Sequence, residues 1–148
     1  MISTALAAAL RDAGLSWTPV SGDQFQISGP DFEGDVFTVS DMTIEAHTYP
    51  TGTVLGFNGT TEWALDSVSL DDALWPPRED QLRDALAGTF VGLTREVPGS
   101  PGTGARASAE IISYTVTTRV DGAEARATSD DPAEAYGLAL LALLRSLG

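Results

Sequence analysis

The chain has 148 residues, 43% of them hydrophobic, and a formal net charge of −13 at pH 7. This length fits one domain with a buried core, and the hydrophobic content is that of a globular protein rather than a disordered chain. The sequence has no cysteine, which excludes disulfides and thiolate sites, and its negative charge disfavours direct binding to nucleic acid or anionic membranes. No apolar run is long enough to span a membrane, so we expect a cytoplasmic protein without membrane insertion.

The first expected element is an amphipathic helix over residues 4–13. Ser3 is suited to cap its N-terminus, and Gly14 is suited to end it, because glycine accepts a positive φ. Arg11 and Asp12 follow the apolar start at once, and no basic segment precedes it, which argues against a secretion signal.

Alternating apolar and polar residues then predict a series of short antiparallel strands. We expect a hairpin between residues 15–17 and 25–27, with Trp17 and Phe25 pointing inward. Asn58-Gly59 predicts a two-residue hairpin turn, because both residues tolerate a positive φ. The segment after this turn is also compatible with a short helix, but its alternation favours a strand. The further strands expected in this half cover residues 35–40, 42–49, 53–57 and 60–68.

The second half of the sequence predicts two more helices and a second set of strands. A helical turn over residues 69–75 precedes a helix that begins at Pro77 and ends at Gly88, with acidic residues at its positive end. Asp121-Gly122 predicts another two-residue hairpin turn. The strands around it are expected at residues 89–96, 108–120 and 123–128.

A third helix is expected from Asp131 to about Ser146. Asp131 is its N-cap, Pro132 its first residue and Glu134 the reciprocal partner in a variant of the capping box. The order of helix, strands, helix, strands and helix predicts an α+β fold. We therefore expect a single domain over residues 1–148, with an antiparallel β-meander sheet and three helices.

Two segments resemble ligand-binding loops but lack residues that those loops need. Residues 99–104 are rich in glycine, yet no lysine follows them and a strand is expected next, so we predict no nucleotide binding. Asp31, Glu33 and Asp35 have the spacing of calcium-loop carboxylates, but Met42 stands where such a loop requires glutamate. The sequence therefore predicts no cofactor and no metal site.

His47 is the only histidine, and Glu45 lies two residues before it on an expected strand. Residues two apart on a strand share a face, so the pair could perform acid–base chemistry, with Asp41 or Asp66 as a further candidate across the sheet. The sequence contains no G-x-S-x-G nucleophile motif. A lone histidine more commonly lies on the surface without a catalytic role, so catalysis is the alternative hypothesis.

The third expected helix is apolar around most of its circumference. Such a helix either lies in the centre of its own domain or covers its second face with another chain. Trp75 precedes Pro76-Pro77 at a bend, where a half-exposed aromatic side chain could anchor a partner. The candidate partner-binding residues are Trp75, Tyr136, Leu140, Leu143 and Leu147.

Three segments carry a family resemblance: SDMTIE at residues 40–45, LGFNGTTEWALDSV at 55–68 and LWPPREDQL at 74–82. They resemble a family of small proteins from GC-rich Gram-positive bacteria that carry the label pilus assembly protein CpaE. The resemblance covers roughly residues 1–90. It implies a small bacterial cytosolic protein linked to pilus or secretion systems, and it implies no catalytic residues.

The leading hypothesis is therefore a non-enzymatic protein-interaction or accessory module that binds a protein partner or associates with itself. One alternative is a small enzyme that uses His47 with Glu45 or Asp66. A further alternative is an acidic mimic of nucleic acid, which would need its carboxylates arrayed on one face.

Overall fold

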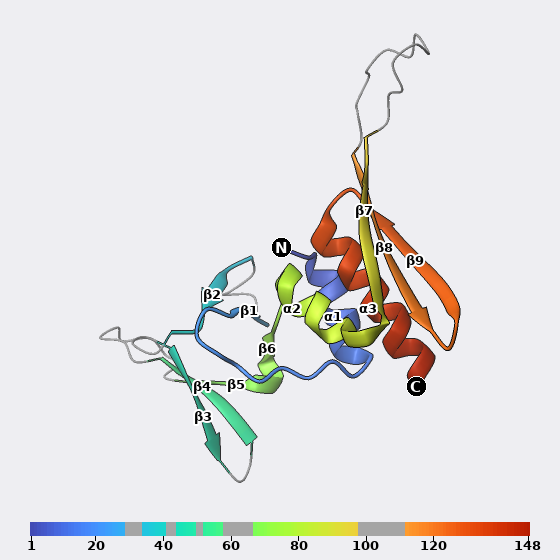
Figure 1. The fold of residues 1–148 in the computed structure, drawn as a ribbon. Helices are drawn as coiled ribbons and strands as arrows, with labels where there is room; N and C mark the ends of the chain where they lie inside the picture. The colour runs from blue at the N-terminus through green and yellow to red at the C-terminus, as the bar shows by residue number, and fades with distance from the viewer. Residues whose placement is uncertain (29–33, 41–43, 50–51, 58–66, 98–111) are drawn as a thin grey trace. The chain divides into compact units, whose positions relative to one another are not determined.

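The computed structural model describes residues 1–28, 34–40, 44–49, 52–57, 67–97 and 112–148 (Figure 1). Within these ranges it contains three α-helices and three three-stranded sheets, and every strand pair is antiparallel. This composition confirms the predicted α+β class. The chain divides into two compact units, which we call unit 1 (residues 1–13 and 78–148) and unit 2 (residues 14–77). In the sequence, unit 2 is therefore an insertion between two helices of unit 1.

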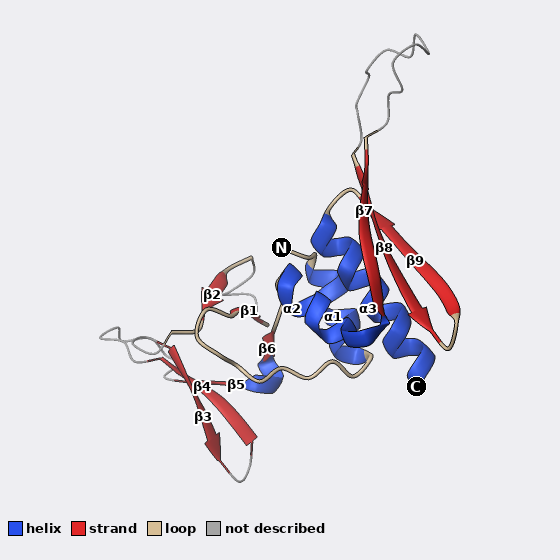
Figure 2. Cartoon of the chain, viewed as in Figure 1, coloured by secondary structure: helices blue, strands red, loops and turns tan. Residues whose placement is uncertain are grey.

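Unit 1 combines three helices with one sheet (Figure 2). The sheet is a meander in the order β7-β8-β9, and the third helix, α3, contacts β8 and β9 as well as both other helices. The chain itself therefore covers α3 from more than one side. The elements of unit 1 are α1 (Thr4–Asp12), α2 (Glu79–Leu86), β7 (Phe90–Glu96), β8 (Ser113–Val120), β9 (Ala123–Ser129) and α3 (Pro132–Leu147).

The packing of α1 on α3 depends on Gly137. A Cβ atom at this position would lie 2.6 Å from Cδ2 of Leu6 and 3.6 Å from Cγ2 of Ile2. Glycine therefore lets the two helices approach more closely than any other residue would. Other large buried side chains of unit 1 include Leu10, Leu82, Leu86, Val116, Tyr136 and Leu140.

The N-terminus of α3 is capped as predicted, but Glu134 has a different partner. Asp131 accepts hydrogen bonds from the backbone N–H groups of Ala133, at 2.8 Å, and Glu134, at 3.4 Å. The Glu134 carboxylate does not close the predicted capping box. It accepts the backbone N–H of Ser3 instead, 131 residues earlier in the chain, and so joins the first turns of α3 and α1.

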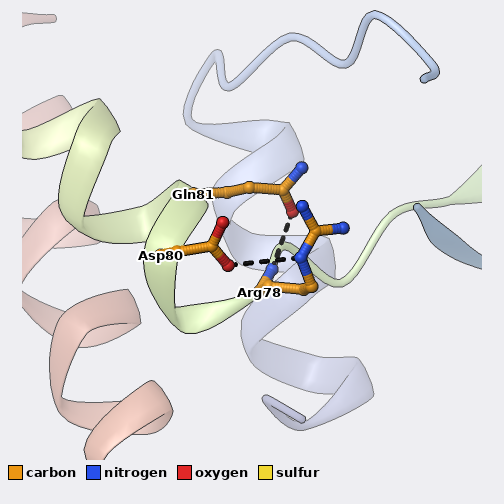
Figure 3. Close-up of polar contacts among 3 residues, drawn as sticks. All are labelled: Arg78, Asp80 and Gln81. Atoms are coloured by element: carbon orange, nitrogen blue, oxygen red, sulfur yellow. Dashed lines mark hydrogen bonds and ion pairs between the residues drawn. The ribbon is translucent and has the colours of Figure 1, made fainter. Parts of the chain in front are cut away.

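The second helix begins two residues later than predicted, at Glu79 rather than Pro77. Figure 3 shows why Arg78 is the residue before the first turn: Oε1 of Gln81 accepts its backbone N–H at 2.9 Å. The Arg78 side chain also reaches forward, with Nε 3.2 Å from Oδ1 of Asp80. These contacts fix the first turn of α2 from both its backbone and its side chains.

Positive φ angles occur at two predicted places, after α1 and in the turn between β8 and β9. Gly14, with a φ of 108°, follows α1, and Ser3 caps the same helix by accepting a backbone N–H of its first turn. Asp121 and Gly122, with φ angles of 51° and 83°, form the turn between β8 and β9. The end of α2 differs, because Ala87 takes a φ of 50° and the helix stops before Gly88.

Unit 2 contains two sheets, in the orders β2-β1-β6 and β3-β4-β5. A 3-10 turn, Leu70–Asp72, separates β5 from β6. The core of unit 2 consists of Phe25, Ile27, Val39 and Ala73, with Trp17 and Phe37 packed against them. The strands are β1 (Gln24–Ile27), β2 (Val36–Thr38), β3 (Ile44–Tyr49), β4 (Gly52–Phe57), β5 (Ser67–Ser69) and β6 (Ala73–Leu74).

Two sequence predictions for unit 2 were wrong. Residues 15–17 form no strand, and β1 pairs instead with β2 and β6. The indole of Trp17 is fixed by a hydrogen bond to Asp23, so a side chain rather than a strand ladder holds this segment. The helical turn expected up to residue 75 ends at Asp72, and β6 begins at the next residue, Ala73. The Asn58-Gly59 turn and the glycine-rich loop at 99–104 lie outside the described residues.

We predict that Gly137→Val destabilises the protein by about 1–3 kcal/mol, because its side chain would overlap Leu6 in a packed helix contact. Urea unfolding followed by circular dichroism measures this change. Gly88→Val is the control, since no atom lies within 4 Å of a Cβ at that position. Equal losses of stability in the two variants would contradict a close contact at Gly137.

We also predict that Arg78→Gln raises the pKa of Asp80. Slight burial raises this pKa, but the hydrogen bond and charge of Arg78, with the backbone N–H groups of Asp80 and Gln81, outweigh burial and hold it below the ordinary value. A lowered folded-state pKa stabilises the fold above the unfolded pKa, and this contribution is lost as pH falls through the folded pKa.

The stability difference between the wild-type protein and Arg78→Gln should therefore be present at neutral pH and shrink in acid. An NMR titration of the Asp80 carboxyl measures the pKa directly. Arg145→Gln, which removes an exposed arginine from α3, should leave that pKa unchanged. An Asp80 pKa that does not respond to Arg78→Gln would contradict the assignment.

Candidate functional site

The proposed catalytic pair lies on β3, an edge strand of its sheet. The backbone pairs His47 with Val54 and Glu45 with Gly56, both on β4. The two residues thus have the strand spacing that the acid–base hypothesis requires. The further candidates, Asp41 and Asp66, lie outside the described residues, so the catalytic arrangement remains a prediction.

The partner-binding candidates on α3 divide into enclosed and accessible positions. Tyr136 and Leu140 are each 2% exposed, and the Tyr136 ring lies 5.6 Å from the ring of Phe90. These two side chains belong to the core of unit 1. Leu143 is half-buried, whereas Leu147 is 73% exposed at the C-terminal end of the helix. The apolar surface that α3 offers a partner therefore consists of its last turns and of Leu138, which is 38% exposed in the first half of the helix.

Trp75 belongs to an aromatic cluster in unit 2. Its ring stacks on Trp17, with the centroids 6.0 Å apart and the planes inclined by 10°, and Trp17 also contacts Phe25 at 5.8 Å. Trp75 is half-buried, and its Nε1 group has no hydrogen-bond partner among the described residues. The residue thus retains part of the exposure that a partner anchor needs, although packing within unit 2 covers the rest.

A buried carboxylate supports this aromatic cluster. Asp23 is only 1% exposed, and its Oδ2 atom accepts hydrogen bonds from Nε1 of Trp17, at 2.9 Å, and from the backbone N–H of Val20, at 3.1 Å. Asp23 lies between residues 17 and 25, where the sequence predicted only the turn of a hairpin. Its structural role could not be recognised from spacing alone, because an aspartate near glycine is typical of any exposed turn.

Unit 1 also has an exposed apolar edge that was not predicted from the sequence. β7 is an outer strand of its sheet, and in the described part of the chain no strand pairs with its other edge. Val91 is 49% exposed, Leu93 is 37% exposed, and Val97, just beyond the strand, is 52% exposed. Apolar side chains along an unpaired edge are unusual, because natural sheets commonly protect their edges from association.

Charge is distributed very unevenly between the two units. Residues 14–77 contain ten aspartate and glutamate residues and no lysine or arginine, so unit 2 carries −10 of the total charge of −13. All eight arginines lie in unit 1, where they nearly balance eleven carboxylates. Unit 2 therefore has a strongly negative field of its own, which extends about 8 Å into physiological salt.

Neither a metal centre nor a membrane span is found in the part of the chain that the structure describes. No group of three or more histidine, aspartate or glutamate residues there is arranged to hold a metal ion. None of the helices there is both long and apolar enough to cross a membrane.

Comparisons with known proteins give no further assignment. No protein-family model matches the chain, and neither a curated protein nor a solved structure matches it. The resemblance to the CpaE-labelled family therefore rests on the sequence segments between residues 40 and 82 alone.

We predict that Asp23→Ala destabilises the protein by about 2–3 kcal/mol, because it leaves the donors of Trp17 and Val20 without their acceptor. Urea unfolding followed by circular dichroism measures the loss. Asp35→Ala removes an exposed carboxylate of the same unit and should change stability by less than about 0.5 kcal/mol. If the two variants unfold at the same urea concentration, Asp23 does not have the supporting role assigned to it.

Proposed function

We propose that the protein is a non-enzymatic interaction module of the bacterial cytosol, whose unit 2 binds a basic surface of a protein partner. The observation that carries this proposal is the confinement of all arginines to unit 1. A unit with ten carboxylates and no lysine or arginine attracts cations and repels nucleic acid and acidic proteins. A basic protein partner fits these electrostatics best.

The exposure of several of these carboxylates supports the proposal. Asp35 precedes β2, and Asp71 and Asp72 lie in the 3-10 turn before β6; all three residues are exposed. Complementary charge accelerates association and excludes wrong partners more than it raises affinity. Trp75, three residues after Asp72 and half-buried, supplies an aromatic side chain of the kind that often dominates binding energy.

The sequence resemblance adds a cellular setting to this proposal. It links the chain to pilus or secretion systems, in which the module would act as an accessory protein. The acidic-mimic hypothesis uses the same charge distribution, with a nucleic-acid-binding protein as the partner. The accessory-module and acidic-mimic hypotheses differ in one property. Nucleic acid competes with this protein for the partner only if the protein is an acidic mimic.

The test compares two matched pairs of charge-neutralising substitutions. Asp35→Asn with Asp72→Asn changes unit 2, and Asp84→Asn with Asp121→Asn makes the same change in charge on exposed positions of unit 1. The wild-type protein is first used to capture a partner from a bacterial lysate. The purified partner is then titrated with each variant by calorimetry at two salt concentrations.

We expect the unit 2 variant to bind the partner roughly tenfold more weakly and with a smaller dependence on salt, while the unit 1 variant binds like wild type. Equal weakening in both variants, or affinity that does not change with salt, would show that unit 2 is not the docking surface. Competition by duplex DNA would identify the partner as a nucleic-acid-binding protein and favour the mimic.

A further inference from the structure

We propose that two copies of the chain pair through the free edges of their β7 strands. In this pairing the strands run antiparallel about a two-fold axis that passes Thr94, and the two three-stranded sheets of unit 1 join into one sheet. The occupant of the β7 edge is thus a second copy of this chain. This surface is separate from the acidic surface to which the proposed function assigns the protein partner.

Large apolar side chains distinguish β7 from the other edge of the same sheet. Residues 93–97 are all exposed, and this run contains Leu93 and Val97. The opposite edge strand, β9, has the sequence AEARATS and presents no large apolar side chain. Glu124 of β9 also forms an ion pair with Arg119 of β8, at 2.8 Å, so this edge is charged. Association through backbone pairing therefore favours β7.

The register within the sheet indicates where the axis lies. Thr94 pairs with Thr115, and Thr115 pairs with Thr128, so the three threonines form one row across the sheet. The hydroxyls of Thr115 and Thr128 already lie 2.8 Å apart. Threonine pairs directly opposite each other stabilise neighbouring strands, and an axis at Thr94 continues this row into the second copy.

Charges on β7 exclude the neighbouring registers toward its C-terminal end, and the threonine row favours Thr94 over an axis at Leu93. When two copies of a strand pair about a two-fold axis, the sequence numbers of facing residues always have the same sum, and the residue at the axis faces its own copy. An axis at Arg95 or Glu96 would therefore set identical charges opposite each other. An axis at Thr94 instead places Glu96 opposite Gly92 of the second copy and Arg95 opposite Leu93 of the second copy. The two Leu93 side chains then lie diagonally across the axis on one face, within reach of each other. Like charges directly opposite are avoided throughout.

The overall charge of the chain also favours unit 1 as the surface of self-association. Two copies repel each other through unit 2, which has no lysine or arginine, whereas unit 1 has a net charge of only −3. Pairing at β7 brings the weakly charged units together. Added salt should strengthen such a dimer, because it screens the remaining repulsion between two chains of charge −13.

The natural absence of cysteine permits a direct test by single-cysteine cross-linking of the full chain. Residues directly opposite in an antiparallel pair have Cα atoms about 4.5–5.5 Å apart, which suits a disulfide. Under mild oxidation, Thr94→Cys should form a covalent dimer that is visible on a non-reducing gel. Leu93→Cys on the same strand, and Thr128→Cys at the far end of the threonine row, should form much less.

Sedimentation of the wild-type chain over a range of concentrations provides the independent measurement. We expect a dimer that weakens roughly tenfold or more in Leu93→Lys, with the circular dichroism spectrum unchanged because the side chain is exposed. A chain that stays monomeric at all concentrations, cross-linking that is as fast at Leu93 or Thr128 as at Thr94, or a dimer unaffected by Leu93→Lys would each overturn the proposal. None of these results depends on the basic partner proposed for unit 2.

Discussion

The burial of α3 is the constraint on which unit 1 depends. A sixteen-residue helix with leucine or alanine at most positions gains about 25 cal/mol for each Å² of apolar surface removed from water, so leaving one side exposed would be costly. The chain resolves this by placing β8 and β9 against α3 and by bringing α1 and α2 to it as well. Gly137 and the bond between Glu134 and Ser3 hold α1 in place, so the first thirteen residues and the last seventy-one form one unit.

Local signals in the sequence were sufficient for the first and third helices and for the turn between β8 and β9. Ser3, Asp131 and the Asp121-Gly122 turn act through backbone groups within three residues, and the structure confirms them. The partner of Glu134 could not be foreseen in this way, because it lies 131 residues away. The same limit applies to β1. Its residues pair with partners ten to fourteen and forty-six to forty-eight positions further along, rather than with residues 15–17.

The candidate site was only partly predictable for a related reason. The apolar character of α3 suggested a partner surface, but composition cannot distinguish a helix enclosed by its own chain from one shared with another. The enclosure of Tyr136 and Leu140 depends on how the sheet and α1 pack. Leu147 stays exposed because it lies at the end of the helix. Leu93 stays exposed because it lies on an edge strand, β7. The uneven division of charge could be recognised only with the boundary between the two units, and the sequence alone did not mark that boundary.

The two proposed surfaces have opposite requirements, and the chain meets them in different units. Self-association needs apolar contact and little net charge, whereas docking to a basic partner needs an uncompensated negative field. A surface that combined both would repel its own second copy. With arginine excluded from residues 14–77, unit 2 keeps its full charge, and pairing at β7 uses residues of unit 1 alone. A dimer joined in this way presents two acidic units at once, so a partner with repeated basic sites would bind more tightly than either unit alone allows.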